Sequence, residues 1–306
     1  MTDVEKSICP LRDAPPRHLI VTLYGLYARE EHDWLPIRAV VRLMGELGVD
    51  EQSVRSSISR LKRRDTLRSL SRDGVTGYAL SPAMADVLGA GDERIFGGES
   101  RPLSDGWVQI VFTVPENERG RRHELRSALT RLAFGLVAPG VWIAPAALKA
   151  EAQAALDRQQ LSGYVDVFAV RHLGFAEVSE RIRDWWDLDA IADAYSAFVG
   201  EYEPMSRQLG RRTPPTDEAF ADYIQMLTGW RQLRYLDPGL PAEVLPQGWP
   251  GDDAGTLFTA LSHALRPLAH DHAMQVMHDR TVRPAESRRC LAPRRAQRHP
   301  TAGPLQ

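Results

Sequence analysis

The feature that most constrains the fold is a series of three short amphipathic segments near the N-terminus. Apolar residues recur at helical spacing in each segment: Leu19, Leu23, Leu26 and Tyr27; Ile37, Val40, Val41 and Met44; and Val54, Ile58 and Leu61. Pro15-Pro16 before the first segment, Gly48 after the second and Asp50 before the third are residues suited to helix ends. We therefore predict three successive helices.

A hairpin signal follows these helices directly. Leu67 to Ser71 and Val75 to Leu80 have strand propensity, and Asp73-Gly74 lies between them. Both residues of this pair tolerate the positive φ that a tight hairpin turn requires. Three helices followed by a hairpin is the order of a winged helix-turn-helix domain. Ser81 can cap a further helix, and a glycine-rich stretch then predicts a boundary near residue 100.

The middle of the chain alternates between strand and helix patterns. The predicted elements are strand 107–113, helix 118–134, strands 135–138 and 141–144, helix 145–161 and strand 164–170. This βαββαβ order predicts a ferredoxin-like domain. From residue 177 onward the pattern is helical, with predicted helices at 178–184, 188–202, 217–233 and 255–278 and a loop rich in proline and glycine at 237–251.

We therefore expect an α+β multidomain protein. Its predicted parts are a flexible N-terminus (1–16), a winged helix-turn-helix DNA-binding domain (17–100), a ferredoxin-like domain (105–175), a helical effector or dimerisation domain (176–278) and a disordered basic tail (279–306). A chain of 306 residues suits several domains, since one ordinary core needs roughly 100 to 200 residues.

The composition is that of a folded, soluble protein. Hydrophobic residues make up 43% of the chain and charged residues 25%, and no apolar run is long enough to span a bilayer. The acidic start, with Asp3 and Glu5, does not resemble a secretory signal. The two cysteines, Cys9 and Cys290, support neither a disulfide framework nor a cysteine-based zinc site. We expect a cytoplasmic protein with no membrane partner.

The net charge of −2 conceals a local basic patch in the third predicted helix and the hairpin. Opposite the apolar stripe of this helix lie polar and basic residues that suit base recognition in the major groove of DNA: Gln52, Ser53, Ser56, Arg60 and Arg63. Neighbouring residues complete the predicted DNA-binding set: Arg55, Ser59, Lys62 and Arg64. Arg55 and Lys62 lie on the flanks of the helix, where we expect phosphate contacts or pairing within the molecule. Arg72, at the hairpin tip, is expected to meet a phosphate or a narrow minor groove. The alternative is a basic helix that is merely solvated.

Two other groups of residues have weaker functional interpretations. The basic tail, including Arg288, Arg289, Arg294, Arg295 and Arg298, can add nonspecific phosphate contacts, although a solvated terminus is the simpler interpretation. Histidines at 263, 270, 272 and 278 invite a metal interpretation, which we discount because no cysteine accompanies them. We expect no metal, no cofactor and no enzymatic activity, since no nucleophile motif or phosphate-binding glycine loop is present.

Several motifs together resemble the PaaX family of regulators of phenylacetic acid catabolism, over most of residues 17–278. The motifs are VRSSISRL at 54–61, RIF at 94–96, LVAPGVWI at 136–143, WDL at 186–188 and LPAEVLP at 240–246. The resemblance implies a homodimeric repressor that binds a palindromic operator in double-stranded DNA. It also implies release from DNA when an aryl-CoA thioester, typically phenylacetyl-CoA, is bound.

A pocket for such an effector needs cations for phosphates and an aromatic hollow for the acyl group. The candidate residues are Trp142, Arg183, Trp185, Trp230, Arg231 and Arg234. At Gly229-Trp230-Arg231 the chain departs from the His-Glu-Tyr-like run expected of the family. A regulator that responds to another acyl-CoA or aromatic compound is therefore an alternative.

Two further alternatives concern the class of function. The middle domain is similar to the ferredoxin-like fold of CRISPR-associated endoribonucleases, but these need an acid at the end of the first strand, where this chain has Thr113-Val114-Pro115. A metal-dependent nuclease is thus less favoured than a scaffold or dimerisation role. The remaining alternative is an interaction module whose winged helix contacts another protein.

Overall fold

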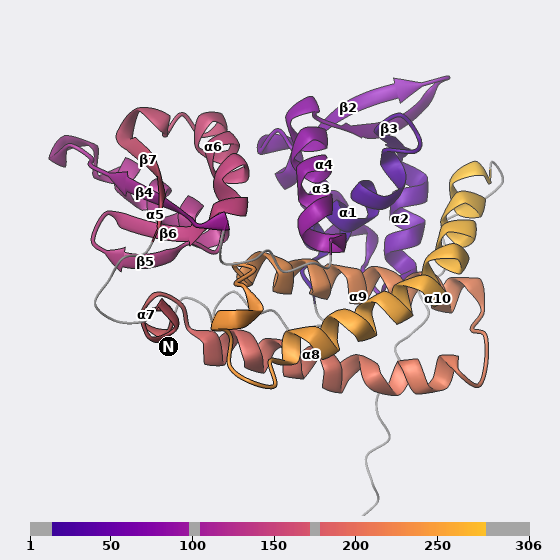
Figure 1. The fold of residues 1–306 in the computed structure, drawn as a ribbon. Helices are drawn as coiled ribbons and strands as arrows, with labels where there is room; N and C mark the ends of the chain where they lie inside the picture. The colour runs from indigo at the N-terminus through magenta and orange to yellow at the C-terminus, as the bar shows by residue number, and fades with distance from the viewer. Residues whose placement is uncertain (1–13, 98–104, 172–177, 280–306) are drawn as a thin grey trace, which may run out of the picture.

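The computed structural model describes residues 14–97, 105–171 and 178–279 (Figure 1). The expectations for Cys9, Cys290, most of the N-terminus and the basic tail lie outside these residues. Within the described part of the chain, no helix combines the length and apolar character needed to cross a membrane.

The N-terminal part contains helices around a small antiparallel sheet. Its elements are α1 (Pro16–Leu23), a π-helical turn (Tyr24–Ala28), β1 (Trp34–Pro36), α2 (Ile37–Glu46), α3 (Glu51–Arg63), β2 (Leu67–Arg72), β3 (Val75–Leu80) and α4 (Pro82–Phe96). The predicted hairpin is present, because Asp73 and Gly74 both have positive φ, 49° and 76°, and Arg72 pairs with Val75.

One strand of this sheet is not predicted by the sequence pattern. The pattern at 33–36 indicates only a break between helices, but Trp34–Pro36 forms β1 and pairs with β3. A three-residue strand is too short for an alternating pattern to be visible, so only its pairing partner defines it. Gly77 allows the close approach of β1, since a Cβ at this position would lie 2.4 Å from the Leu35 carbonyl oxygen.

The middle part has the predicted βαββαβ order. Its elements are β4 (Trp107–Phe112), α5 (Arg119–Arg131), β5 (Gly135–Ala138), β6 (Val141–Pro145), α6 (Lys149–Arg158) and β7 (Val165–Val170). The strands form an antiparallel sheet in the order β5-β6-β4-β7. Alternate residues of β4, such as Ile110, join a core with Leu125 and Leu129 of α5 and Leu156 of α6.

The C-terminal part is helical, as predicted. Its helices are α7 (Val178–Trp185), α8 (Leu188–Leu209), α9 (Thr216–Leu236) and α10 (Pro250–His278). All four are longer than predicted, and the largest differences are in α8, which continues through Pro204 to Leu209, and in α10, which begins at Pro250. Packing of α8 and α10 against α9 supports the helix around Pro204 and Pro267.

The N-terminal and C-terminal parts share one hydrophobic core. Leu23 and Tyr24 from the N-terminal part lie in the same buried cluster as Phe220, Trp230 and Leu265 from the C-terminal helices. Figure 1 shows α1 to α4 seated on α9 and α10, with the middle domain beside them. The position of α3 is therefore tied to the C-terminal helices, although the whole middle domain separates the two parts along the chain.

The close approach at Gly77 predicts a local loss of stability. Replacing Gly77 with Ala should lower the free energy of unfolding by roughly 1–3 kcal/mol, because β1 and the Trp34 ring must shift away from the new methyl group. Gly45→Ala is a matched control, since nothing lies within 4 Å of a Cβ at this position in α2. Urea denaturation of both variants measures the difference. Equal stability of the two would contradict the prediction.

Candidate functional site

Helix α3 begins at a side-chain cap. The Asp50 carboxylate accepts hydrogen bonds from the Ser53 backbone N–H at 2.9 Å and the Ser53 hydroxyl at 2.7 Å. These bonds, the side-chain bond first, lower the pKa of Asp50 below its usual value. Ser53 therefore serves the helix cap, and its hydroxyl is already bonded to Asp50.

The predicted apolar stripe of α3 is buried. Val54, Ile58 and Leu61 are at most 7% exposed and pack in the shared core, together with the small polar side chain of Ser57. The opposite face is exposed as the spacing predicts, and its residues are Gln52, Ser56, Ser59, Arg60, Arg63 and Arg64. The inward stripe fixes which side chains face solvent.

The cations of this exposed face have few intramolecular partners. Arg60 makes one long contact, from Nη2 to the Ser57 hydroxyl at 3.3 Å. In the part of the chain that the structure describes, neither Arg63 nor Arg64 forms an ion pair with a carboxylate. By contrast, Arg55 pairs with Glu51 at 2.6 Å, and the Lys62 ammonium lies 5.6 Å from the centre of the Tyr78 ring. Three arginines at the C-terminal end of α3 are thus available to an anionic partner.

The position of Arg72 corrects an expectation. Its guanidinium donates to the carbonyls of Glu31 and His32, at 3.3 and 3.0 Å, and lies 5.4 Å from the centre of the Trp34 ring. The side chain is half-buried and does not extend from the hairpin tip. These contacts join the hairpin to the loop before β1.

A cavity of about 660 Å³ lies where the three parts of the chain meet. Its walls come from α1 and the π-helical turn, α4, α5, α6, α7 and α9. Apolar walls are formed by side chains such as Leu26, Leu88, Phe134 and Trp185. A volume of about 300–1,000 Å³ with mainly apolar walls is typical of small-molecule sites.

The polar groups of this cavity come from all three parts of the chain. Arg29 forms a two-pronged ion pair with Asp92, at 2.7 and 3.1 Å. Arg231 of α9 donates through Nη1 to the Thr22 hydroxyl of α1 at 2.9 Å. Burial, and then the charges of Arg17 and Arg231, lower the pKa of His18 to about 4.

The predicted effector residues do not form one group. Trp185 and Arg231 line the cavity. Trp142 lies in the middle domain beside a separate hollow of about 400 Å³, with Arg122 and Arg126. Arg183 is exposed on α7 and does not line the cavity.

Trp230 and Arg234 have structural contacts instead. The Trp230 indole N–H donates to the Ile95 carbonyl at 2.8 Å, and its ring stacks on Phe258 at 4.5 Å. Arg234 donates to the Arg94 carbonyl at 2.9 Å. Trp142, Arg183, Trp230 and Arg234 therefore do not line the cavity that contains Arg231.

Sequence reasoning does not select His18, Arg29 or Asp92. His18 lies in α1, Arg29 directly follows the π-helical turn and Asp92 lies in α4, and none of them is part of a recognisable functional motif. Their relation to Arg231 arises because α1, α4 and α9 cross in the fold. No signal in the sequence alone would have identified them.

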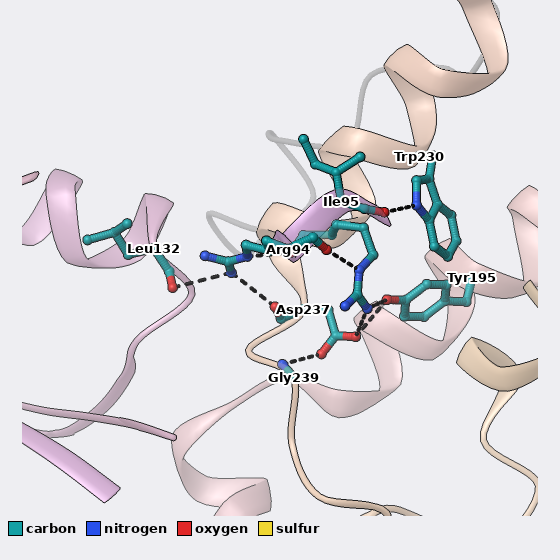
Figure 2. A network of polar contacts seen from close by, with 8 residues as sticks. Arg94, Ile95, Leu132, Tyr195, Trp230, Asp237 and Gly239 are labelled. Carbon is teal, nitrogen blue, oxygen red and sulfur yellow. Dashed lines mark hydrogen bonds and ion pairs between the residues drawn. The ribbon is translucent and has the colours of Figure 1, made fainter. Parts of the chain in front are cut away.

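Arg94 joins all three parts of the chain beside the cavity (Figure 2). From α4 it donates to the carbonyls of Leu132, Arg234 and Asp237, at 3.4, 2.8 and 3.1 Å, and pairs with Glu151 of α6 at 3.1 Å. Its side chain is only 9% exposed. The motif at 94–96 therefore contains the residue that holds the middle domain against the helices.

Three of the four histidines of α10 face glutamates of the N-terminal part. His272 lies 2.7 Å from Glu46, and His270 lies 3.5 Å from Glu30. His278 lies 3.4 Å from Glu31. The described residues hold no group of three or more potential metal ligands. These histidines therefore contact the N-terminal part rather than one another.

Comparisons with known proteins agree in assigning the whole chain to one kind of protein. Family models match in succession: PaaX-like protein over residues 15–84, PaaX protein central Cas2-like domain over 100–182 and PaaX-like protein C-terminal domain over 186–275. The chain is 26% identical over 260 residues to Transcriptional repressor PaaX of Escherichia coli (strain K12), which covers 82% of this chain and 80% of that protein.

A solved structure has a similar fold. Uncharacterized protein Rv0674 from Mycobacterium tuberculosis aligns with a TM-score of 0.51 and 20% sequence identity, over 83% of this chain and 97% of that one. At this identity the likeness concerns the fold alone.

The low pKa of His18 predicts a pH-dependent stability. An unfolded histidine has a pKa of 6.5, whereas the folded value is about 4, so the unfolded chain binds more protons between these limits. The contribution of His18 to stability is therefore complete above pH 6.5 and is lost as the pH falls through about 4. In urea denaturation, the stability difference between the wild type and His18→Gln should shrink across this window. A difference that is the same at neutral and acidic pH would contradict this assignment.

Proposed function

Because the chain belongs to the PaaX family of transcriptional regulators, we propose that it is a repressor that binds double-stranded DNA through α3. Its target is an operator of a phenylacetate-type catabolic operon, and an aryl-CoA thioester such as phenylacetyl-CoA releases it. A regulator tuned to a different acyl-CoA or aromatic ligand is the second candidate, favoured by the departure at Gly229-Trp230-Arg231.

The observation that carries the proposal is the exposed basic face of α3. Arg60, Arg63 and Arg64 project from a helix whose other face is buried against α1 and α2. Arginine forms paired hydrogen bonds with guanine in the major groove, and its charge also suits phosphate. The β2–β3 hairpin directly follows α3 in the chain, as the wing follows the recognition helix in a winged helix-turn-helix domain.

The middle domain suits a dimer scaffold rather than a catalytic centre. Its sheet order, β5-β6-β4-β7, is that of a ferredoxin-like fold. Exposed apolar side chains lie on its two edge strands, Leu136 and Val137 on β5 and Phe168 on β7, at 40%, 37% and 48% exposure. Exposed apolar edge strands favour association with another chain. A homodimer would present two copies of α3 to a palindromic operator.

We place the effector in the cavity between the three parts. The cavity touches α1, which packs directly on α3, and α9 and α5, which do not belong to the DNA-binding part. A ligand releases DNA only if it binds the DNA-incompetent arrangement more tightly. A site shared by the segments that must move relative to each other meets this condition.

Replacing Arg60 tests the contact with bases. Arg60→Ala should weaken binding to the chain's own promoter by roughly 1–3 kcal/mol if Arg60 contacts a base. Arg207→Ala is a matched control, because Arg207 is exposed on α8 and faces Glu203 at 3.7 Å. Fluorescence anisotropy with labelled promoter DNA measures both. Unchanged affinity of Arg60→Ala would remove this residue from the interface.

Salt dependence distinguishes DNA binding from a protein-interaction module. Affinity for promoter DNA should fall steeply with added salt, because each phosphate contact releases counterions. The double substitution Arg63→Ala and Arg64→Ala should reduce the slope of log affinity against log salt by about 1 for each arginine that meets a phosphate in the wild type. No binding to promoter DNA at low salt would instead favour a protein partner.

A further inference from the structure

We propose that Arg231 is the anion-recognition residue of the cavity and that the cavity takes a small organic anion with an apolar or aromatic body. The proposal deepens the proposed function, on which it rests for the identification of this ligand as the effector. It assigns a chemical role to the residue at which this chain departs from the expected family pattern.

Arg231 has unused hydrogen-bonding capacity in a partly buried position. A guanidinium has five N–H donors, and the structure records one bond, to the Thr22 hydroxyl at 2.9 Å. In the described part of the chain, no carboxylate oxygen lies within ion-pair distance of Arg231. Burial lowers the pKa of this guanidinium, and the charges of Tyr235 and Asp92 act in the opposite direction without cancelling that effect.

The carboxylates around the cavity are occupied. Asp92 is held by Arg29, and Glu151 pairs with Arg94. Asp187 accepts a hydrogen bond from the Ala190 backbone N–H at the start of α8, at 3.0 Å. None of these carboxylates forms an ion pair with Arg231. The positive charge of Arg231 is therefore available to pair with an anionic ligand.

The other groups near Arg231 indicate that the ligand is only partly polar. His18 stays neutral at physiological pH, and within the described residues its Nδ1 has no hydrogen-bond partner. Val21, Leu26 and Leu88 supply apolar walls beside it. An anionic group on Arg231 would therefore be attached to an apolar body that fills the rest of the cavity.

Arg231 also connects the cavity to the DNA-binding part. Its Thr22 partner on α1 lies 2.8 Å from the Thr228 hydroxyl of α9, in a buried contact. Helix α1 packs on both α9 and α3. An anion that binds Arg231 would compete with the Thr22 hydroxyl for this guanidinium and so alter the contacts between α1 and α9. Because α3 packs on α1, its orientation would change with those contacts.

Two sources supply this ligand chemistry: a free aryl carboxylate, or the phosphates of a CoA thioester. The test is isothermal titration calorimetry on the full-length wild type, Arg231→Met and Arg231→Lys. The probes are phenylacetate, its neutral amide phenylacetamide, phenylacetyl-CoA and CoA. Arg207→Met, which removes a cation on α8 outside the cavity lining, is the control.

We expect the Kd of a bound anion to rise about 10- to 100-fold in Arg231→Met, the loss typical of a charge-assisted hydrogen-bonded pair, and less in Arg231→Lys. Binding of phenylacetate but not phenylacetamide supports the proposal with a carboxylate as the source. Binding of phenylacetyl-CoA and CoA, both weakened in Arg231→Met, supports it with phosphate as the source.

The proposal is overturned if a compound binds the wild type and Arg231→Met with the same Kd, or if no probe binds the wild type at millimolar concentration. Circular dichroism checks that Arg231→Met is folded, and Arg231→Lys provides the same comparison with the charge kept. Promoter binding is measured on the same preparations without ligand. Failure of the wild type to bind DNA would defeat the proposed function while leaving the ligand titration valid.

Discussion

The arrangement of the three parts depends on the side chain of Arg94. It leaves α4 at the end of the N-terminal part and reaches the carbonyl at the end of α5, the carboxylate of Glu151 on α6 and two carbonyls at the end of α9. Each bond involves a charged donor in a position that water scarcely reaches, where such bonds are stronger than on the surface. Arg234 complements it by donating back to the Arg94 carbonyl. The middle domain is attached both by these polar bonds and by Trp107 and Ile143, which join the shared apolar core, whereas the N-terminal and C-terminal helices are joined by the extensive apolar packing of that core.

This difference in attachment has a consequence for regulation. A well-packed apolar core resists small adjustments, whereas a joint made of hydrogen bonds and a cavity can take up alternative arrangements. The cavity lies beside the joint and is bounded by α1, the helix on which α3 rests. The proposed ligand at this position would act on the link between the segments and would leave the folding of each segment intact.

The local patterns of the sequence predicted most of the secondary structure. The apolar spacing of α3, its Asp50 cap and the Asp73-Gly74 turn each encode their own structure within a few residues. The exposed arginines of α3 followed from the same pattern, because a buried stripe determines the opposite face. By contrast, β1 and the extension of α8 through Pro204 depend on partners distant in sequence, so local propensity could not predict them.

Residue patterns along the chain were enough to establish the order of the elements, the exposed basic face of α3 and the family resemblance. Only the packing of the helices determined which polar residues surround the cavity. Packing places His18 and Asp92 in the cavity wall with Arg231, and it places Trp142 and Arg183 elsewhere. The difference arises from the range of the forces involved. Helical periodicity and capping act between neighbours in the chain. The cavity is formed where helices distant in sequence bury apolar surface against one another. Because the hydrophobic effect has no direction, an apolar stripe does not specify which other helix it will pack against.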